Sequence, residues 1–341
     1  MTGAFLTALF FAGNAVCARR AALHYGGTLG NFLRLLLAVA LLGAWAHAAG
    51  QGAAGGAFTW FFVSGCVGFG LGGLTMFHAL PLIGSNLSML IVQCGSAVAA
   101  AAVEWLWLGT RLSAAQAGLA ALTLAGVIIG LVASPNGARP ACSNGANREK
   151  PAMDDTKSQF VYERTSAPGE SHVLLVGSIS GFALGVGLAI VSACAQGGGA
   201  VISRKAFAVL RAQGFFMDAA TSAYQRALGG LAVGVLALII VRRWPAAERK
   251  LTTESEPVPA MAVPSWIWVV LNTLLGPVLG VTCFQWALRT TPAGLVLPIV
   301  ATAPLLTVPI ARALEHSRPT PRYWLGAVLA VLGAAGLAVV K

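Results

Sequence analysis

GNAVCARRA at residues 13–21 and GGAVISRKA at residues 198–206 are two versions of one stretch. Five of their nine positions are identical, and Arg20 in the first is matched by Lys205 in the second. Each version ends a long apolar run with paired positive charges. One such stretch could belong to a targeting signal or a solitary membrane anchor. A second copy in the other half of the chain indicates that both belong to a repeated unit.

The composition places the chain in a lipid bilayer. Of its 341 residues, 57% are hydrophobic and only 10% are charged, and the mean hydropathy is +0.77. A soluble domain carries about 25% charged residues, so this chain lacks the polar surface that a water-soluble globule needs. The formal charge is +11, but the basic residues flank apolar runs. We therefore expect them to contact membrane lipid headgroups and expect no nucleic acid as a partner.

The first apolar run is expected to be a retained helix. A cleaved signal peptide places positive charge before its apolar segment, whereas here Arg19 and Arg20 come at its end. Residues 2–23 also reach the roughly 20 residues that one crossing requires.

Apolar stretches of spanning length follow one another along both halves of the chain. They are continuously apolar, without the alternation of a transmembrane β-barrel, so helices are expected. The sequence therefore predicts an all-α membrane protein of ten transmembrane helices. The expected spans are residues 2–23, 29–48, 58–79, 83–107, 113–133, 174–203, 216–241, 264–287, 291–313 and 321–340.

A polar stretch at residues 134–172 divides the chain. It is rich in Pro, Asn, Ser and charge, which is typical of a flexible linker. We expect one five-helix repeat at residues 1–133 and a second at residues 173–341. Matched residues recur in the same order in both, namely Arg34 and Arg226, Gly68 and Gly276, Gly72 and Gly280, and Gly118 and Gly326. A unit with an odd number of spans recurs upside down, so the halves are expected to be inverted repeats with a binding site near the bilayer midplane.

The order of these features resembles the drug/metabolite transporter superfamily, of the EamA-domain type. The resemblance rests on the repeated opening stretch, on an arginine in the second helix of each half, and on the closing stretch ALEHSRPTPRYWLGAVLAVLGAAGL at residues 313–337. There, Glu315 precedes a polar turn and a glycine-rich last helix. The first half departs from this pattern, because Thr110 stands where the family usually has a glutamate.

The resemblance implies a secondary transporter of a small organic solute, such as an amino acid, another metabolite or a drug-like compound. It further implies alternating access, export, proton coupling and no cofactor. We expect a multi-pass protein of the inner (plasma) membrane, as a monomer or homodimer. The resemblance places both termini in the cytoplasm, whereas the distribution of Lys and Arg favours the reverse. The alternatives are a sugar-phosphate or nucleotide-sugar exchanger and a non-transporting membrane scaffold. An enzyme is not expected, because no catalytic cluster is recognised.

Polar side chains inside the expected spans are the candidate binding residues, because such groups are costly in lipid. Asn14, Gln93, Gln196 and Thr302 are uncharged candidates. Each could hydrogen-bond a solute or simply tie two helices together.

Arg34, Arg226 and Glu104 are the charged candidates. A guanidinium suits an anionic group such as a carboxylate, but an arginine can also extend to lipid headgroups. Glu104 could exchange protons if it is deeply buried, or it could be a solvated acid at the membrane interface.

His78, Gln285 and Trp286 are the remaining candidates, late in the third and eighth spans. A histidine there could couple transport to protons. It could equally be a neutral hydrogen-bonding residue.

Overall fold

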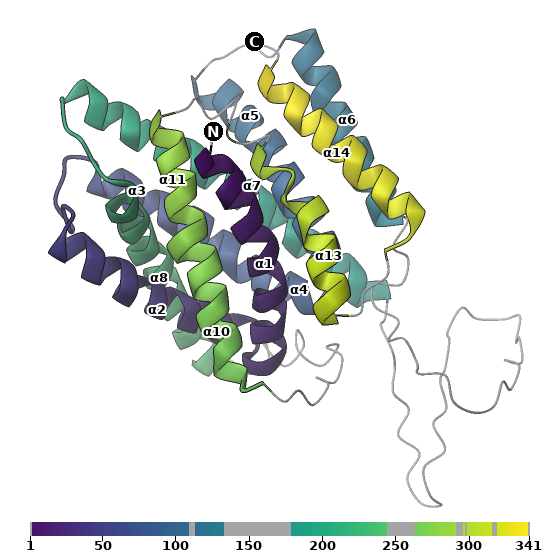
Figure 1. The fold of residues 1–341 in the computed structure, drawn as a ribbon, viewed down its shortest axis with the longest axis horizontal. Coiled ribbons are helices and arrows are strands. Elements are labelled where there is room, and N and C mark those ends of the chain that lie inside the picture. Colours follow the sequence, from purple (N-terminus) through teal and green to yellow (C-terminus); the bar gives the residue numbers. More distant parts are fainter. Residues whose placement is uncertain are drawn as a thin grey trace, which may run out of the picture.

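The structure, a computed structural model, describes residues 2–108, 113–132, 179–243, 263–290, 296, 299–315 and 319–339. Within these ranges the chain is helical and has no β-strand (Figure 1). A peptide group in hydrocarbon has no water to bond, and a helix satisfies it internally. The predicted linker at residues 134–172 lies outside the described residues.

The helices follow the chain in the order of their labels. They are α1 (Thr2–Tyr25), α2 (Gly27–Ala48), α3 (Phe58–Gly65), η1 (Cys66–Leu71), α4 (Gly72–Met89), η2 (Leu90–Cys94), α5 (Gly95–Leu108), α6 (Ala114–Val132), α7 (Ile179–Ala212), α8 (Ala219–Arg243), α10 (Ser265–Thr273), η3 (Leu274–Gly280), α11 (Val281–Thr290), α13 (Ala303–Glu315) and α14 (Pro321–Val339). The three η elements are π-helices.

Several of these segments are long and apolar enough to cross a membrane, so the predicted all-α membrane protein is confirmed. Among the described residues, six segments qualify; the count of ten stays a prediction. The six are Gly27–Ala48, Phe58–Trp107, Ala114–Val132, Gly181–Ala212, Ala219–Arg243 and Ser265–Arg289.

The segment Phe58–Trp107 is 50 residues long, and it changes direction at Gly84. A straight helix of that length would measure about 75 Å, far more than the roughly 30 Å of bilayer hydrocarbon. Gly84 has φ 77° and ψ 166°, a left-handed conformation that glycine adopts readily, and Pro81 interrupts the helical hydrogen bonds just before it. The break between the expected spans 58–79 and 83–107 therefore falls at Gly84.

The end of the sixth expected span, 174–203, is wrong, because the helix continues beyond residue 203. Helix α7 runs to Ala212, and residues 174–178 lie outside the described residues. Apolar residues continue through Ala206, Phe207 and Leu210, all buried, and the chain turns at Gly214 with φ 69°. Arg204 and Lys205 consequently lie within α7 rather than at its end.

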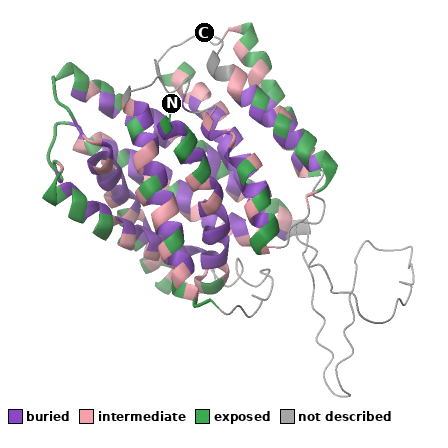
Figure 2. Ribbon diagram, in the orientation of Figure 1, coloured by how far each residue is buried: buried purple, intermediate pink, exposed green. Residues whose placement is uncertain are grey.

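Corresponding helices of the two halves pack antiparallel. In α2 and α8, Tyr224 at the start of α8 lies against Gly43 and His47 near the end of α2, with 3.2 Å between His47 Nε2 and the Tyr224 hydroxyl. Further along, a Cβ on Gly230 of α8 would lie 3.5 Å from Leu35 of α2. Helices α6 and α14 lie side by side at one edge of the bundle, with purple buried residues on their facing sides (Figures 1 and 2).

Helices α1 and α7 also run in opposite directions. Ala4, at the start of α1, shares a hydrophobic cluster with Phe207 and Leu210 near the end of α7. A separate cluster joins Ala189, in the first part of α7, to Ile83 and Tyr323. Buried residues lie on the sides of these helices that face the bundle, and exposed residues lie on its periphery (Figure 2).

The α6–α14 crossing depends on glycine. A Cβ on Gly126 would lie 2.7 Å from the Gly326 carbonyl oxygen, and a Cβ on Gly326 would lie 2.6 Å from the Gly126 carbonyl oxygen. Close backbone approach of this kind is the usual means of packing helices in lipid, where the hydrophobic effect does not drive association.

Gly126→Leu is expected to force α6 and α14 apart and to lower stability by about 1–3 kcal/mol, the usual range for overpacking. The control is Gly118→Leu on the same helix, where an added Cβ meets nothing within 4 Å. Thermal unfolding in detergent measures both. Equal melting temperatures for the two variants would contradict a tight crossing at Gly126.

Candidate functional site

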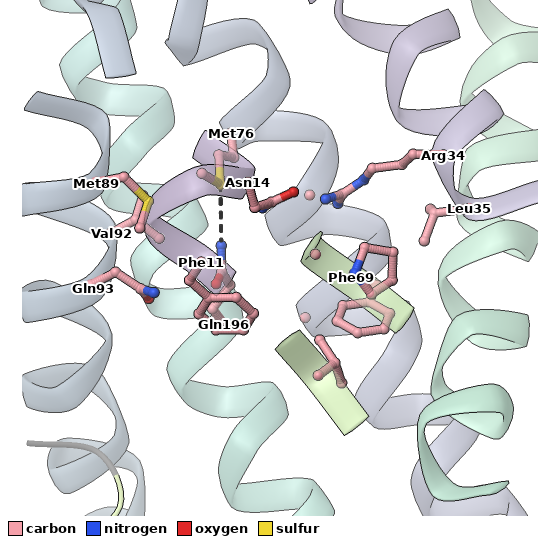
Figure 3. Close-up of a pocket in the computed structure, with 15 residues that line it drawn as sticks. Phe11, Asn14, Arg34, Leu35, Phe69, Met76, Met89, Val92, Gln93 and Gln196 are labelled. Atoms are coloured by element: carbon pink, nitrogen blue, oxygen red, sulfur yellow. Dashed lines mark hydrogen bonds between the residues drawn. The ribbon is translucent and has the colours of Figure 1, made fainter. Parts of the chain in front are cut away.

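A cavity lies in the middle of the bundle, and helices from both halves of the chain line it (Figure 3). It has two adjoining parts of about 50 Å³ each, enough for a few water molecules. We call it the central cavity. Both parts share Phe11, Gly68, Phe69, Gln93, Gln196 and Val281.

The first part is also lined by Asn14, Arg34, Leu35, Gly73, Met76, Met89, Val92, Gly276 and Pro277. The second part is also lined by Ser96, Gly197, Ala200, Arg226, Phe284 and Val300.

The π-helices all contribute to this lining. Gly68 and Phe69 come from η1, Gln93 from η2, and Gly276 and Pro277 from η3. A π-helix inserts a wide turn into an α-helix, and such turns are frequent at functional sites. The expected glycine pair Gly68 and Gly276 therefore lies at one cavity, from opposite halves of the chain.

Arg34 of α2 lines the first part of the cavity. Its side chain is buried, its Nε donates to Asn31 Oδ1 over 3.0 Å, and its guanidinium carbon lies 4.7 Å from the centre of the Phe77 ring. Figure 3 shows the guanidinium directed toward the carboxamide of Asn14.

Arg226 of α8 lines the second part. It is also buried, its guanidinium carbon lies 4.8 Å from the centre of the Phe69 ring, and its Nε has no hydrogen-bond partner. A Cβ on Gly68 would lie 3.1 Å from Arg226 Nη2, so glycine at 68 leaves room for this side chain. The two arginines that sequence matching paired are thus both buried beside the cavity, and burial of this degree disfavours their extension to lipid headgroups.

Three of the uncharged candidates also line the cavity. Asn14 is buried and its Oδ1 has no hydrogen-bond partner. Gln93 is buried on η2. Gln196 Nε2 donates to Ser192 Oγ over 3.1 Å and approaches Met76 Sδ at 3.7 Å (dashed in Figure 3).

Four candidates lie elsewhere. His78 bonds the Leu74 carbonyl through Nδ1 and approaches Thr28 through Nε2, next to the turn between α1 and α2. Gln285 donates to Ser203 Oγ over 3.3 Å, and Thr302 donates to the Ile299 carbonyl over 2.6 Å. Trp286 is 41% exposed. None of the four lines the central cavity.

Glu104 forms an ion pair with Arg204 of α7, and their side chains are 25% and 37% exposed. It is therefore neither a lone buried acid nor a wholly solvated one. Sequence matching did not find this partner, because the expected sixth span ended before Arg204.

A second ion pair, which the sequence did not predict, joins Arg19 to Glu315. Arg19 Nη1 lies 3.4 Å from Glu315 Oε2, and the side chains are only 9% and 3% exposed. Ser85 Oγ donates to the same carboxylate oxygen over 2.7 Å. Arg19 and Arg204 occupy matched positions in the repeated stretch, so the repeat itself could have suggested that both seek a carboxylate.

Within the described ranges, no three His, Cys, Asp or Glu side chains gather as a metal site would require. The cavity offers two guanidiniums, three carboxamides and aromatic faces. This set can bind and orient a small polar molecule.

Comparison with known proteins agrees with this arrangement. No curated protein matches the chain. A solved structure titled "Crystal structure of protein" has the same fold, with a TM-score of 0.52 and 19% identity over 97% of this chain and 95% of that one. Residues 183–339 match the family described as the EamA-like transporter family. The second half of the chain is therefore similar to the EamA-like transporter family, and the apolar helices of spanning length indicate a multi-pass membrane protein.

Proposed function

We propose that the chain is a secondary transporter that moves a small organic solute across the membrane by alternating access. The observation that carries this proposal is the central cavity, which holds charged and amide side chains in a mainly apolar lining, is lined by helices of both halves, and lies between two ion pairs at opposite ends of the bundle.

The packing supports two inverted halves, at residues 1–133 and 173–341. Corresponding helices α2 and α8 are antiparallel, as a unit and its inverted copy require. The π-helices η1 and η3 occupy the same place in each half, and Arg34 and Arg226 contribute equivalent charges. Inverted repeats allow one half to rock against the other around a fixed central site.

The two ion pairs lie at opposite ends. Arg204 belongs to the last part of α7, which packs with the start of α1, whereas Arg19 belongs to the last part of α1. The Arg19–Glu315 pair is buried, and the Glu104–Arg204 pair is partly exposed. We assign the buried pair to the closed side of the cavity and the exposed pair to the side that opens more easily.

Protonation of either glutamate would remove one partner of its ion pair. An exposed pair stabilises by only about 0.2–1 kcal/mol, whereas breaking a buried pair costs about 3–5 kcal/mol. Protonation of Glu104 therefore costs less than protonation of Glu315, and we propose Glu104 as the residue that couples transport to a proton gradient. The proposed direction of transport is export. The proposed location is the inner (plasma) membrane with cytoplasmic termini, and a single chain contains the whole cavity.

Gly68→Leu is expected to abolish transport, because its side chain would occupy space shared by both parts of the cavity. The measurement is solute movement by purified protein in proteoliposomes, with a panel of amino acids, organic anions and lipophilic cations, with and without a pH gradient.

The matched control is Gly187→Leu on α7, where an added Cβ meets nothing within 4 Å. It is expected to transport as the wild type does. Full transport by a folded Gly68→Leu variant would count against a route through the central cavity.

Glu104→Gln is expected to keep the fold, because its ion pair is partly exposed, but to lose acceleration by a pH gradient. The exchanged variant Glu104→Arg/Arg204→Glu restores opposite charges and is expected to recover more transport than either single charge reversal. Wild-type acceleration by the gradient in Glu104→Gln would show that Glu104 does not couple transport to protons.

Deletion of residues 140–170 separates a transporter from a scaffold. A scaffold that binds a partner through this stretch loses its function, whereas a transporter is expected to retain at least half of its transport rate. Loss of transport by a deletion variant with an unchanged melting temperature would favour the scaffold.

A further inference from the structure

We propose that the transported solute is an organic dianion, most simply a dicarboxylate, with one acid group on Arg34 and the other on Arg226. This inference rests on the proposed function and names the substrate class of the same cavity.

The cavity carries two positive charges and no acid among its described lining residues. The acids in the described part of the chain are Glu104, Asp218 and Glu315. Glu104 and Glu315 pair with Arg204 and Arg19. Asp218 accepts hydrogen bonds from the backbone and hydroxyl of Thr221 at the start of α8. None is left to neutralise Arg34 or Arg226.

An arginine buried without a carboxylate partner needs another interaction to offset the cost of removing its charge from water. The guanidinium stays charged in proteins, and removing it from water is costly even after the surroundings relax. The rings of Phe77 and Phe69 supply cation–π contacts, which offset only part of this cost. An anionic solute would supply the missing counter-charge.

The free donors are arranged for carboxylates. Arg34 donates a hydrogen bond from Nε to Asn31 Oδ1. The structure shows no hydrogen bond from its two terminal nitrogens to a described residue. The Nε of Arg226 is buried and has no hydrogen-bond partner, and a carboxylate bound in bidentate fashion would satisfy this donor. Asn14 lies where Arg34 points (Figure 3), and its amide nitrogen would donate to the first acid group.

The position of the arginines favours two separate acid groups over one phosphate. Arg34 lines one part of the cavity and Arg226 lines the other. The shared middle is lined by Phe11, Phe69 and Val281 together with two glutamines, which suits a short, mainly apolar spacer. A single phosphate would require both guanidiniums to converge. A lipophilic cation would be repelled by both.

Binding to the wild-type protein tests the inference first. Succinate, glutarate and adipate are each added to detergent-solubilised protein, and the shift in melting temperature is compared with those from butyrate, alanine and tetraphenylphosphonium. We expect stabilisation by at least one dicarboxylate at concentrations ~30-fold or more below those that butyrate requires. No stabilisation by any dicarboxylate, or equal stabilisation by butyrate, overturns the dianion proposal.

Arg34→Gln and Arg226→Gln are each expected to weaken dicarboxylate binding ~30-fold or more and to remove the advantage over butyrate. The control is Arg289→Gln, a cation that lies on the Phe216 ring outside the cavity and is expected to bind dicarboxylates normally. If a glutamine variant fails to fold, Arg→Lys at the same site replaces it and is expected to retain charge but lose bidentate preference.

Transport separates this inference from the proposed function. The dianion proposal is overturned if the protein transports alanine or a cation, if Gly68→Leu abolishes that transport, and if dicarboxylates do not inhibit it. That result would still support the proposed transporter function. Arginine-dependent dicarboxylate binding without movement of any solute supports the anion site and contradicts transport.

Discussion

Hydrocarbon offers no hydrogen-bond partner to a peptide group, and this constraint shapes the bundle. It favours helices throughout the described residues and leaves few places where the backbone can depart from α-geometry. Irregular backbone at membrane depth is tolerated where protein buries it or where it lines a wet cavity. The π-helices η1, η2 and η3 obey this rule, because each turns residues toward the central cavity. The same departures from ideal helices that would be costly at the lipid surface thus create the space in the centre.

The buried arginines fall into two groups that differ in their surroundings. Arg19 reaches Glu315 and the Leu80 carbonyl, and Arg20 reaches the Leu314 carbonyl, so both have protein hydrogen-bond acceptors at the end of α1. Arg34 and Arg226 lie on aromatic rings beside the cavity without a described carboxylate. In surroundings of low dielectric constant, burying a charged guanidinium without a counter-charge costs free energy. Among the described residues no carboxylate lies beside these two arginines, and the anion proposed above would supply the counter-charge.

The repeat was the most informative feature of the sequence, and it located the arginines. Matching the second helix of each half paired Arg34 with Arg226, and matching the third helix paired Gly68 with Gly276, all of which line the cavity. Asn14, Gln93 and Gln196 followed from the cost of polar groups in lipid. Thr302, Gln285 and His78 satisfy the same criterion, yet they bond neighbouring residues away from the cavity. Hydropathy measures depth but not the direction of a side chain, and the π-helices, which change that direction, leave no mark in apolar periodicity.

An inverted repeat also restricts what can set the direction of transport. If the halves are copies, each presents one second-helix arginine to the solute, and the site offers similar chemistry to both sides of the membrane. Direction must then come from what differs between the halves. The closing ion pairs differ most: the Arg19–Glu315 pair is buried and supported by Ser85, whereas the Glu104–Arg204 pair is partly open to solvent. Under the proposed mechanism, this difference in burial between the two ion pairs would therefore set the energetic difference between the two faces of the protein.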